Sequence, residues 1–288
     1  MAGPVLITGA TGLLGQALMG AARSAGLDAV GLARHGADVV CDLVDGAAVN
    51  IALDRIRPEC IINAAAITNL SQCESDPAAA QLVNARAPAI LAEWCRANAA
   101  KIVQISTDHY YCGDGAAQHD ETAHVTLVNE YARTKYAGEA AVLSDPEALV
   151  VRTNITGWRG WPGKPTFFEW VVAALEKHEP MTLFSDFHTS TIDAPSCARH
   201  IFALVARNAR GVVNLAARDV ADKETFVRFV ARVLGIALDN ATPGSVQSLR
   251  PRRAESLGLD VSKAESLLGL RLPAMHDVVH ALLSTRPA

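Results

Sequence analysis

The chain has 288 residues, of which half are hydrophobic and 19% are charged, and its net charge at neutral pH is -4. This length and composition suit a globular protein with a sizeable core, built as one large domain or as two closely joined domains. A weakly acidic chain provides no overall field for capturing nucleic acid or an anionic membrane surface, so we expect neither as a partner.

The amino-terminal residues and the cysteines indicate a cellular compartment. Residues 1–7 lack the basic flank and the long apolar run of a signal peptide, and no later stretch is apolar enough to span a bilayer. Six cysteines are scattered without the spacing of a zinc site or the density of a disulfide framework: Cys41, Cys60, Cys73, Cys95, Cys112 and Cys197. We therefore expect a cytoplasmic protein with free thiols and no bound metal.

The first half of the chain alternates short apolar runs with longer helical patterns. The runs and patterns follow in the order 5–8, 16–24, 29–33, 60–63, 82–98 and 101–106. Short, continuously apolar runs are typical of parallel strands that helices cover on both faces. The sequence therefore predicts an α/β fold with a doubly wound parallel sheet of the Rossmann type.

The regular alternation breaks up after Val151. A stretch rich in glycine, tryptophan and proline, residues 157–163, predicts an irregular loop over a site. Further elements are expected near 167–177 (helix), 212–216 (strand), 223–234 (helix) and from about 275 (helix). We expect residues 1–155 to form the cofactor-binding domain. Residues 156–288 would then form a smaller, mixed substrate lobe, interleaved with returning elements of the sheet.

A glycine-rich turn follows the first predicted strand, with the sequence Thr8-Gly9-Ala10-Thr11-Gly12-Leu13-Leu14-Gly15. Gly9 can make the tight turn, Gly12 lets the backbone approach a pyrophosphate, and Gly15 lets the helix pack closely on the strand. The start of the following helix would then hold the phosphates. A plain turn is the alternative, but the position at the first strand favours dinucleotide binding. The candidate contacts are Gly9, Thr11, Gly12, Leu13 and Leu14.

The end of the second predicted strand bears on the choice of cofactor. A site specific for NAD places an acidic residue there to bind the ribose 2'-hydroxyl. This chain has Arg34 and His35 instead, and a cation suits a 2'-phosphate. The alternative is that Arg34 is an ordinary surface charge. The sequence therefore favours NADPH and leaves NADH open.

The candidate catalytic residues lie in two segments. Tyr131 and Lys135 are four residues apart and share one face of a helix, where the lysine cation would lower the pKa of the phenol. The pair alone is common on helix surfaces. Thr107 follows a buried strand, at the edge where open α/β sheets bind ligands, and its hydroxyl could donate to the same substrate oxygen.

With these motifs in this order, the sequence resembles the extended short-chain dehydrogenase/reductases. The resemblance rests on the turn of residues 8–15, on Asn63-Ala64-Ala65-Ala66, on Thr107, and on Tyr131 with Lys135. A closer likeness is to the dTDP-4-dehydrorhamnose reductase group, through Ser106-Thr107-Asp108 and through the sequence of residues 131–139.

The resemblance implies an NADPH-dependent reductase of a nucleotide-linked 4-ketosugar. Tyr131 would give the proton, Lys135 would hold the ribose hydroxyls and tune Tyr131, and Thr107 would polarise the carbonyl. Further implied cofactor contacts are Asp42, Leu43, Ala64, Ala65 and Ala66. Implied substrate contacts are Thr107, Asp108, His109, Asn154 and Trp158. The resemblance also implies a homodimer that pairs through the helices carrying Tyr131 and Lys135.

Departures from the group's pattern leave the sugar open. His109 stands where the group has Tyr, Cys112 where it has Asp, and Ala132 where it has Gly. His109 could serve as an extra acid or only pack. A nucleotide diphosphate could be bound by the cations of the second half of the chain, each of which could equally be a surface charge: Arg159, Lys164, Arg250, Arg252 and Arg253.

Several other functions stay open. Dehydration is disfavoured, because Asp108 is not followed by the second carboxylate that elimination of water needs. The alternatives are a sugar-nucleotide epimerase, an NADP-binding regulatory subunit resembling that of methionine adenosyltransferase, and a reductase of a small non-nucleotide ketone.

Overall fold

The structure, a computed structural model, describes residues 3–161 and 163–287. The chain forms two compact units, each assembled from three segments. Unit 1 consists of Met1–Thr107, Asn129–Arg152 and Ala198–Val213, and unit 2 of Asp108–Val128, Thr153–Cys197 and Asn214–Ala288. The expected division of function at residue 155 stays a prediction. The compact units cross that boundary, because residues 108–128 fold with unit 2 and residues 198–213 with unit 1.

Unit 1 is built on a seven-stranded sheet with the strand order β12-β7-β5-β4-β1-β2-β3. Its strands are β1 (Val5–Thr8), β2 (Ala29–Ala33), β3 (Val39–Val40), β4 (Cys60–Asn63), β5 (Lys101–Ile105), β7 (Leu149–Arg152) and β12 (Gly211–Asn214). β1 pairs in parallel with both β2 and β4, and β5 pairs in parallel with β4 and β7. β1, β4 and β7 are buried along their whole length, as the continuous apolar runs predict. The predicted doubly wound α/β fold is confirmed.

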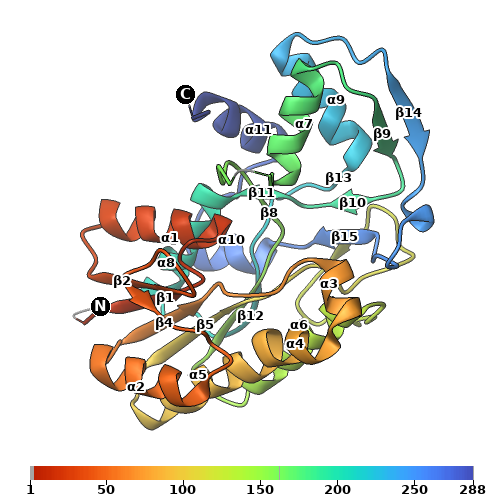
Figure 1. Ribbon diagram of the computed structural model, residues 1–288. Helices are drawn as coiled ribbons and strands as arrows, with labels where there is room; N and C mark the ends of the chain where they lie inside the picture. Colours follow the sequence, from red (N-terminus) through yellow and green to blue (C-terminus); the bar gives the residue numbers. More distant parts are fainter. Residues whose placement is uncertain (1–2, 162, 288) are drawn as a thin grey trace. The chain divides into compact units, whose positions relative to one another are not determined.

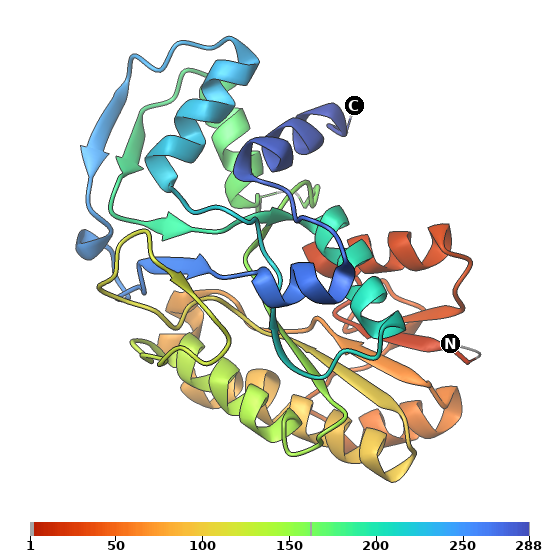
Figure 2. The ribbon, with the colours of Figure 1, turned by 180° about the vertical axis from the view of Figure 1, so that it is seen from behind.

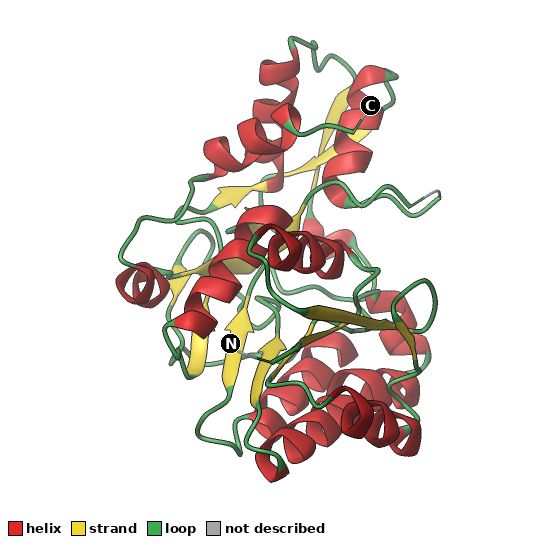
Figure 3. Ribbon diagram, turned by 90° about the vertical axis from the view of Figure 1, so that its left-hand side faces the viewer, coloured by secondary structure: helices red, strands yellow, loops and turns green. Residues whose placement is uncertain are grey.

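Helices cover both faces of this sheet (Figures 1 and 2). α2, α5 and α6 lie on one face and α1 lies on the other, and Figure 3 shows the strands in yellow with helices on both sides. The helices of unit 1 are α1 (Leu13–Ser24), α2 (Gly46–Ile56), α3 (Leu70–Ser75), α4 (Pro77–Gln81), the π-helical turn η1 (Leu82–Arg86), α5 (Ala87–Ala97) and α6 (Glu130–Val142). The single helix predicted over 82–98 is thus a π-helical turn followed by an α-helix.

Unit 2 contains a four-stranded mixed sheet with the order β13-β10-β15-β6. β10 is antiparallel to β13 and parallel to β15. Two further strand pairs, β11-β8 and β14-β9, complete its strands, and the β14-β9 pair lies beside α9 (Figure 1). The strands are β6 (Gln118–His119), β8 (Ile155–Thr156), β9 (Met181–Phe184), β10 (His188–Thr189), β11 (Ile192–Asp193), β13 (Ala221–Asp222), β14 (Ala241–Gly244) and β15 (Ser256–Leu259). The expected smaller, mixed set of strands is confirmed, and it includes β6, which precedes residue 156.

The helices of unit 2 begin and end close to the predicted residues. α7 (Phe167–Glu176) begins at a capping box in which the Thr166 side chain and Glu169 bond each other's backbone. α9 (Lys223–Leu234) begins at the Asp222 cap and ends at Gly235 in the left-handed region. The remaining helices are α10 (Ser262–Leu268), α11 (Met275–Ser284) and the short η2 (Val246–Ser248), while α8 (Ala194–Ala206) runs across the division between the units.

None of the helices in residues 3–161 and 163–287 combines the length and the hydropathy that a membrane span requires.

Candidate active site

The glycine-rich turn connects β1 to α1 with very little space around its backbone. Gly9 has a φ of +66°, and a Cβ on Gly9 would lie 2.8 Å from the backbone of Ala65. A Cβ on Gly15 would lie 2.0 Å from the carbonyl oxygen of Gly9. Gly12 precedes α1 and offers no side chain to cap its first N-H groups. The turn therefore leaves a helix N-terminus open to a phosphate, as the spacing of the glycines predicts.

A buried chain of hydrogen bonds fixes the strand ends below this turn. The Thr8 hydroxyl donates to Asn63 Oδ1, and Asn63 Nδ2 donates to Gln104 Oε1 at 2.7 Å. Asn63 Oδ1 also accepts from the backbone N-H of Ala65 at 3.3 Å. The chain links β1, β4 and β5 and holds the Ala64-Ala65-Ala66 loop against Gly9. Asn63, the first residue of the Asn63-Ala64-Ala65-Ala66 motif, thus fixes the position of the loop that follows it.

The predicted nucleoside contacts differ in their exposure. Arg34 is exposed after β2 and forms no ion pair with the described residues. Asp42 is exposed, and its carboxylate accepts from the N-H of Val44 at 3.1 Å. Leu43 is buried in the core of unit 1. Arg34 is therefore available to an anionic ligand.

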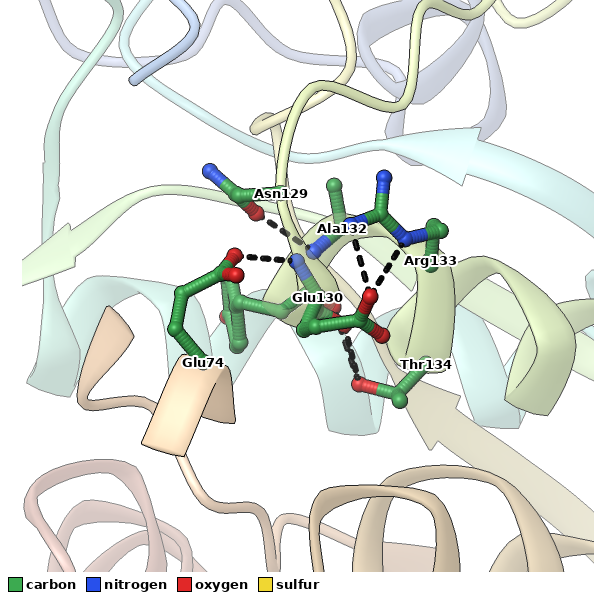
Figure 4. Close-up of polar contacts among 7 residues, drawn as sticks. Glu74, Asn129, Glu130, Ala132, Arg133 and Thr134 are labelled. Atoms are coloured by element: carbon green, nitrogen blue, oxygen red, sulfur yellow. Dashed lines mark hydrogen bonds and ion pairs between the residues drawn. The ribbon is translucent and has the colours of Figure 1, made fainter. Parts of the chain in front are cut away.

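The N-terminus of α6, which carries Tyr131, is held by side chains from two elements (Figure 4). Asn129 caps the helix, and its side-chain oxygen accepts from the N-H of Ala132 at 2.8 Å. The Glu74 carboxylate, from α3, accepts from the N-H of Glu130 at 2.7 Å. Tyr131 itself is 8% exposed and packs against Leu70 and other apolar side chains that follow β4. The first turn of the helix is therefore fixed both by its own cap and by a distant carboxylate.

Lys135 is buried one turn after Tyr131. Its ammonium donates to the carbonyl oxygen of Ile105 at 2.6 Å, at the end of β5 and two residues before Thr107. Burial lowers the pKa of Lys135 to about 8, although the carboxylate of Glu139 opposes this shift. The structure thus brings Lys135 to the strand end that Thr107 follows, as the motif order predicts.

A buried ion pair lies behind Lys135. Arg152, at the end of β7, bonds both carboxylate oxygens of Glu139 at 2.8 to 3.2 Å, and the two side chains are 5% and 1% exposed. Glu139 is four residues after Lys135 on the same helix, so it is the negative charge that favours the protonated lysine. This pair connects α6 to the sheet.

Sequence reasoning missed Asn84, which lies in the π-helical turn η1. Its side-chain oxygen accepts from the N-H of Ile67 at 2.8 Å, and its Nδ2 donates to the Ile67 carbonyl at 3.0 Å and to the Thr134 hydroxyl at 3.1 Å. A Cβ on Gly138 would lie 2.2 Å from the Asn84 carbonyl oxygen. Asn84 therefore ties the loop after β4 to the helix of Tyr131. The available signal was a polar residue inside a mostly apolar helical pattern.

Unit 2 holds most of the predicted substrate residues. Asn154 Nδ2 donates to Asp108 Oδ2 at 2.6 Å, and Asn154 Oδ1 accepts from the Thr191 hydroxyl at 2.9 Å. His109 Nε2 lies 4.0 Å from Asp108 Oδ1. The structure thus brings Asp108, His109 and Asn154 together, and it adds Thr191, which sequence reasoning did not identify.

His109 is a neutral imidazole at pH 7. Burial and, to a smaller extent, the positive charges of Arg253 and Lys223 together lower its pKa to about 4. An imidazolium that could give up a proton is therefore not formed near neutral pH. This result favours the packing role over the extra acid.

Trp158 has partners within unit 2. Its Nε1 donates to the Leu282 carbonyl at 2.7 Å, and its ring meets Phe168 edge-on at 5.0 Å. These contacts account for its burial, and its role as a substrate contact stays a prediction. Nearby, the Arg159 guanidinium lies 4.6 Å from the ring centre of Trp161.

The thiols and other potential ligands form no metal site in the described part of the chain. All six cysteines are free, and burial raises the pKa of Cys197 to about 12. In residues 3–161 and 163–287, no three His, Cys, Asp or Glu side chains are grouped to hold an ion.

The chain is similar in sequence and in fold to proteins of one family. The family described as the RmlD substrate binding domain matches residues 3–286. The chain is 31% identical to a dTDP-4-keto-6-deoxy-D-glucose reductase of Streptomyces niveus, over 92% of each chain. It is 32% identical to a dTDP-4-dehydrorhamnose reductase of Mycobacterium tuberculosis, over 92% of this chain and 87% of that one. The fold matches a dTDP-4-dehydrorhamnose reductase of Bacillus anthracis in complex with NADP. That structure has a TM-score of 0.88 and 23% identity, over 99% of this chain and all of the other.

Proposed function

The chain belongs to the RmlD substrate-binding domain family, and we propose that it uses NADPH to reduce the ketone of a nucleotide-linked 4-ketosugar. It is an NAD(P)-dependent oxidoreductase of the extended short-chain dehydrogenase/reductase type. The strongest support for this reaction is the position of Lys135 and Tyr131 on α6. The Lys135 ammonium is fixed on the carbonyl of Ile105, and Tyr131 lies one turn earlier on the same helix.

The residues of the turn fit a dinucleotide. Side chains are sterically excluded at Gly9 and Gly15, so the backbone N-H groups at the start of α1 are left to bind the pyrophosphate. Arg34 would hold the 2'-phosphate and Lys135 the ribose hydroxyls. When bound, NADPH supplies the hydride for the carbonyl carbon.

Tyr131 would protonate the carbonyl oxygen as the hydride reaches carbon. The Thr107 hydroxyl would donate a hydrogen bond to the same oxygen and stabilise its developing negative charge. The Lys135 cation would favour the phenolate that Tyr131 becomes, because an opposite charge nearby stabilises the ionised form. Asn84 and Glu74 would act at a distance, by holding the helix that carries both residues.

A direct assay tests the reductase. The full chain is mixed with NADPH and the dTDP-linked 4-keto-6-deoxy sugar that the relatives' names indicate, and NADPH oxidation and the reduced sugar are both measured. We expect one reduced sugar for each NADPH consumed, and much lower rates with simple ketones. Tight NADPH binding without oxidation of NADPH by any ketosugar would contradict the proposal and favour a regulatory protein.

The choice of cofactor depends on Arg34. Replacing Arg34 with Ala is expected to weaken NADPH binding by roughly ten- to hundredfold, the range for loss of a hydrogen bond to a charged group. NADH, which lacks the 2'-phosphate, should bind within about twofold of its original affinity, since its binding does not use this contact. Dissociation constants from fluorescence titration provide the check, with the exposed Arg55→Ala as control. Equal losses for both cofactors would refute the role of Arg34.

The homodimer and the cytoplasmic location expected from the sequence stay predictions. Sedimentation of the purified chain measures the oligomeric state directly.

A further inference from the structure

The side chain of Lys223, the first residue of α9, lies next to three phenyl rings of unit 2. Its ammonium is 4.4 Å from the ring centre of Phe167, 5.6 Å from that of Phe187 and 6.0 Å from that of Phe226. A phenyl ring attracts a cation over its face but offers no lone pair to its N-H donors. The rings therefore hold the lysine side chain in place without satisfying its hydrogen bonds.

The ammonium of Lys223 has no hydrogen-bond acceptor among the described residues. The backbone N-H of Lys223 donates to the Phe187 carbonyl at 3.0 Å, whereas its side chain makes no hydrogen bond or ion pair within residues 3–161 and 163–287. The negative charge of Asp108 acts on it from a distance, and one oxygen of that carboxylate is already bonded by Asn154. Its three donors are therefore left to solvent or to the acceptors of a ligand.

Arg253 is a second cation of the same kind. It is partly buried, and its Nε is buried without a hydrogen-bond partner in the described part of the chain. Both Arg253 and Lys223 act electrostatically on His109, and both disfavour its protonation. Phe187, one of the rings next to Lys223, also packs in one cluster with Ala254, the residue after Arg253, so the segments that carry the two cations lie close together.

The cluster formed by Asp108, His109, Lys223 and Arg253 carries a net positive charge. Asp108 contributes one negative charge, Lys223 and Arg253 contribute two positive charges, and His109 is neutral at pH 7. The remaining positive charge lies among aromatic side chains, where an interaction with an anion is stronger than in water. The cluster also begins at Asp108, which is covalently joined to Thr107, the residue proposed to bind the carbonyl.

We propose that Lys223 and Arg253 form a subsite for an anionic oxygen group of the substrate. This inference rests on the proposed function, since it assigns the site to the same sugar nucleotide. Two parts of such a molecule have this chemistry, namely a carboxylate on the sugar and the diphosphate of the nucleotide. Lys223 is then a specificity-determining residue, because a substrate without an anionic group would leave its ammonium unpaired.

Binding measurements with three non-reacting probes test the subsite and distinguish the two sources. Calorimetry gives the affinity of dTDP, dTDP-glucose and dTDP-glucuronic acid for the full chain, for Lys223→Met and for Arg253→Met. Lys223→Met keeps the length of the side chain and its packing against the rings while removing the charge. Lys177→Met, at an exposed lysine of unit 2, is the matched control.

The expected result is a loss of affinity of roughly ten- to hundredfold in Lys223→Met, the range for a hydrogen bond to a charged group, with a smaller loss in Arg253→Met. A loss for all three probes places the diphosphate at Lys223. A loss confined to dTDP-glucuronic acid places a sugar carboxylate there. Unchanged affinities for all three probes, or no binding of any probe to the original chain, would overturn the subsite.

Two further readouts separate the subsite from a structural role and from the reductase activity. A structural role would lower the melting temperature of Lys223→Met, whereas removal of an unpaired ammonium should leave it unchanged or raise it. If the original chain oxidises NADPH with the ketosugar, and Lys223→Met keeps the same KM and the same affinity for all three probes, the subsite is refuted while the reductase activity stands.

Discussion

Replacing Tyr131 with Phe is expected to lower kcat by about 10²- to 10⁴-fold, the usual contribution of a positioned proton donor. The phenyl ring keeps the apolar contacts of Tyr131 with Leu70 and its neighbours, so the helix should stay folded. Without the hydroxyl, however, the carbonyl oxygen must take its proton from water as the hydride arrives. The affinity for NADPH should change by less than about threefold, because the loss falls on the transition state and not on the bound cofactor.

Steady-state NADPH oxidation and fluorescence titration of NADPH measure the two effects separately. Tyr136→Phe, on the same helix, is the matched control and should keep nearly the full rate. A Tyr131→Phe enzyme with unimpaired turnover would remove the basis of the proposed mechanism. A variant that lost NADPH binding and turnover together would instead indicate that Tyr131 serves mainly to bind the cofactor.

Arg152→Met is expected to destabilise the protein by about 3–5 kcal/mol, the range for removing one partner of a buried ion pair. Glu139 is 1% exposed, and Arg152 donates hydrogen bonds to both of its carboxylate oxygens, so the variant leaves a negative charge without its main partner. The position of α6 on the sheet depends on this pair. Lys135 lies on the same helix, so activity should fall as well. The shift of the urea unfolding midpoint measures the loss.

A double variant and a surface pair provide the controls for this prediction. Glu139→Gln with Arg152→Met removes both charges and should recover at least half of the lost stability, because no unpaired charge is left buried. Arg210→Met breaks the Arg210–Glu147 pair, whose side chains are 48% and 55% exposed, and should cost less than about 1 kcal/mol. Equal losses in Arg152→Met and Arg210→Met would contradict the account of the buried pair.

The arrangement around Lys135 would let one helix hold both of the groups proposed to meet cofactor and substrate. Its ammonium is held at the end of β5 by a backbone carbonyl, so its position depends on the sheet and not on a mobile loop. The cap at Asn129 and the carboxylate of Glu74 fix the start of the same helix. A shift of this helix would therefore have to break contacts with β5, with α3 and with its own cap.

The sequence by itself determined the features that depend on local spacing. Continuous apolar runs predicted the buried parallel strands, because only apolar side chains can be covered on both faces. The three glycines predicted a turn with no room for side chains, and the structure shows this directly at Gly9 and Gly15. The four-residue spacing of Tyr131 and Lys135 placed them on one face of a helix. These are constraints within a few residues of the chain, so they can be read without the fold.

Only the tertiary structure decided which distant groups meet. Residues 108–128 join unit 2 although they lie between two segments of unit 1, and no local pattern marked this change. Asn154 reaches Asp108 across 46 residues, and Asn84 reaches Thr134 across 50. The ammonium of Lys223, at the start of α9, meets the rings of Phe167 and Phe187, which come from other segments of the chain. Such contacts depend on how elements far apart in the sequence pack, and local spacing carries no information about that packing.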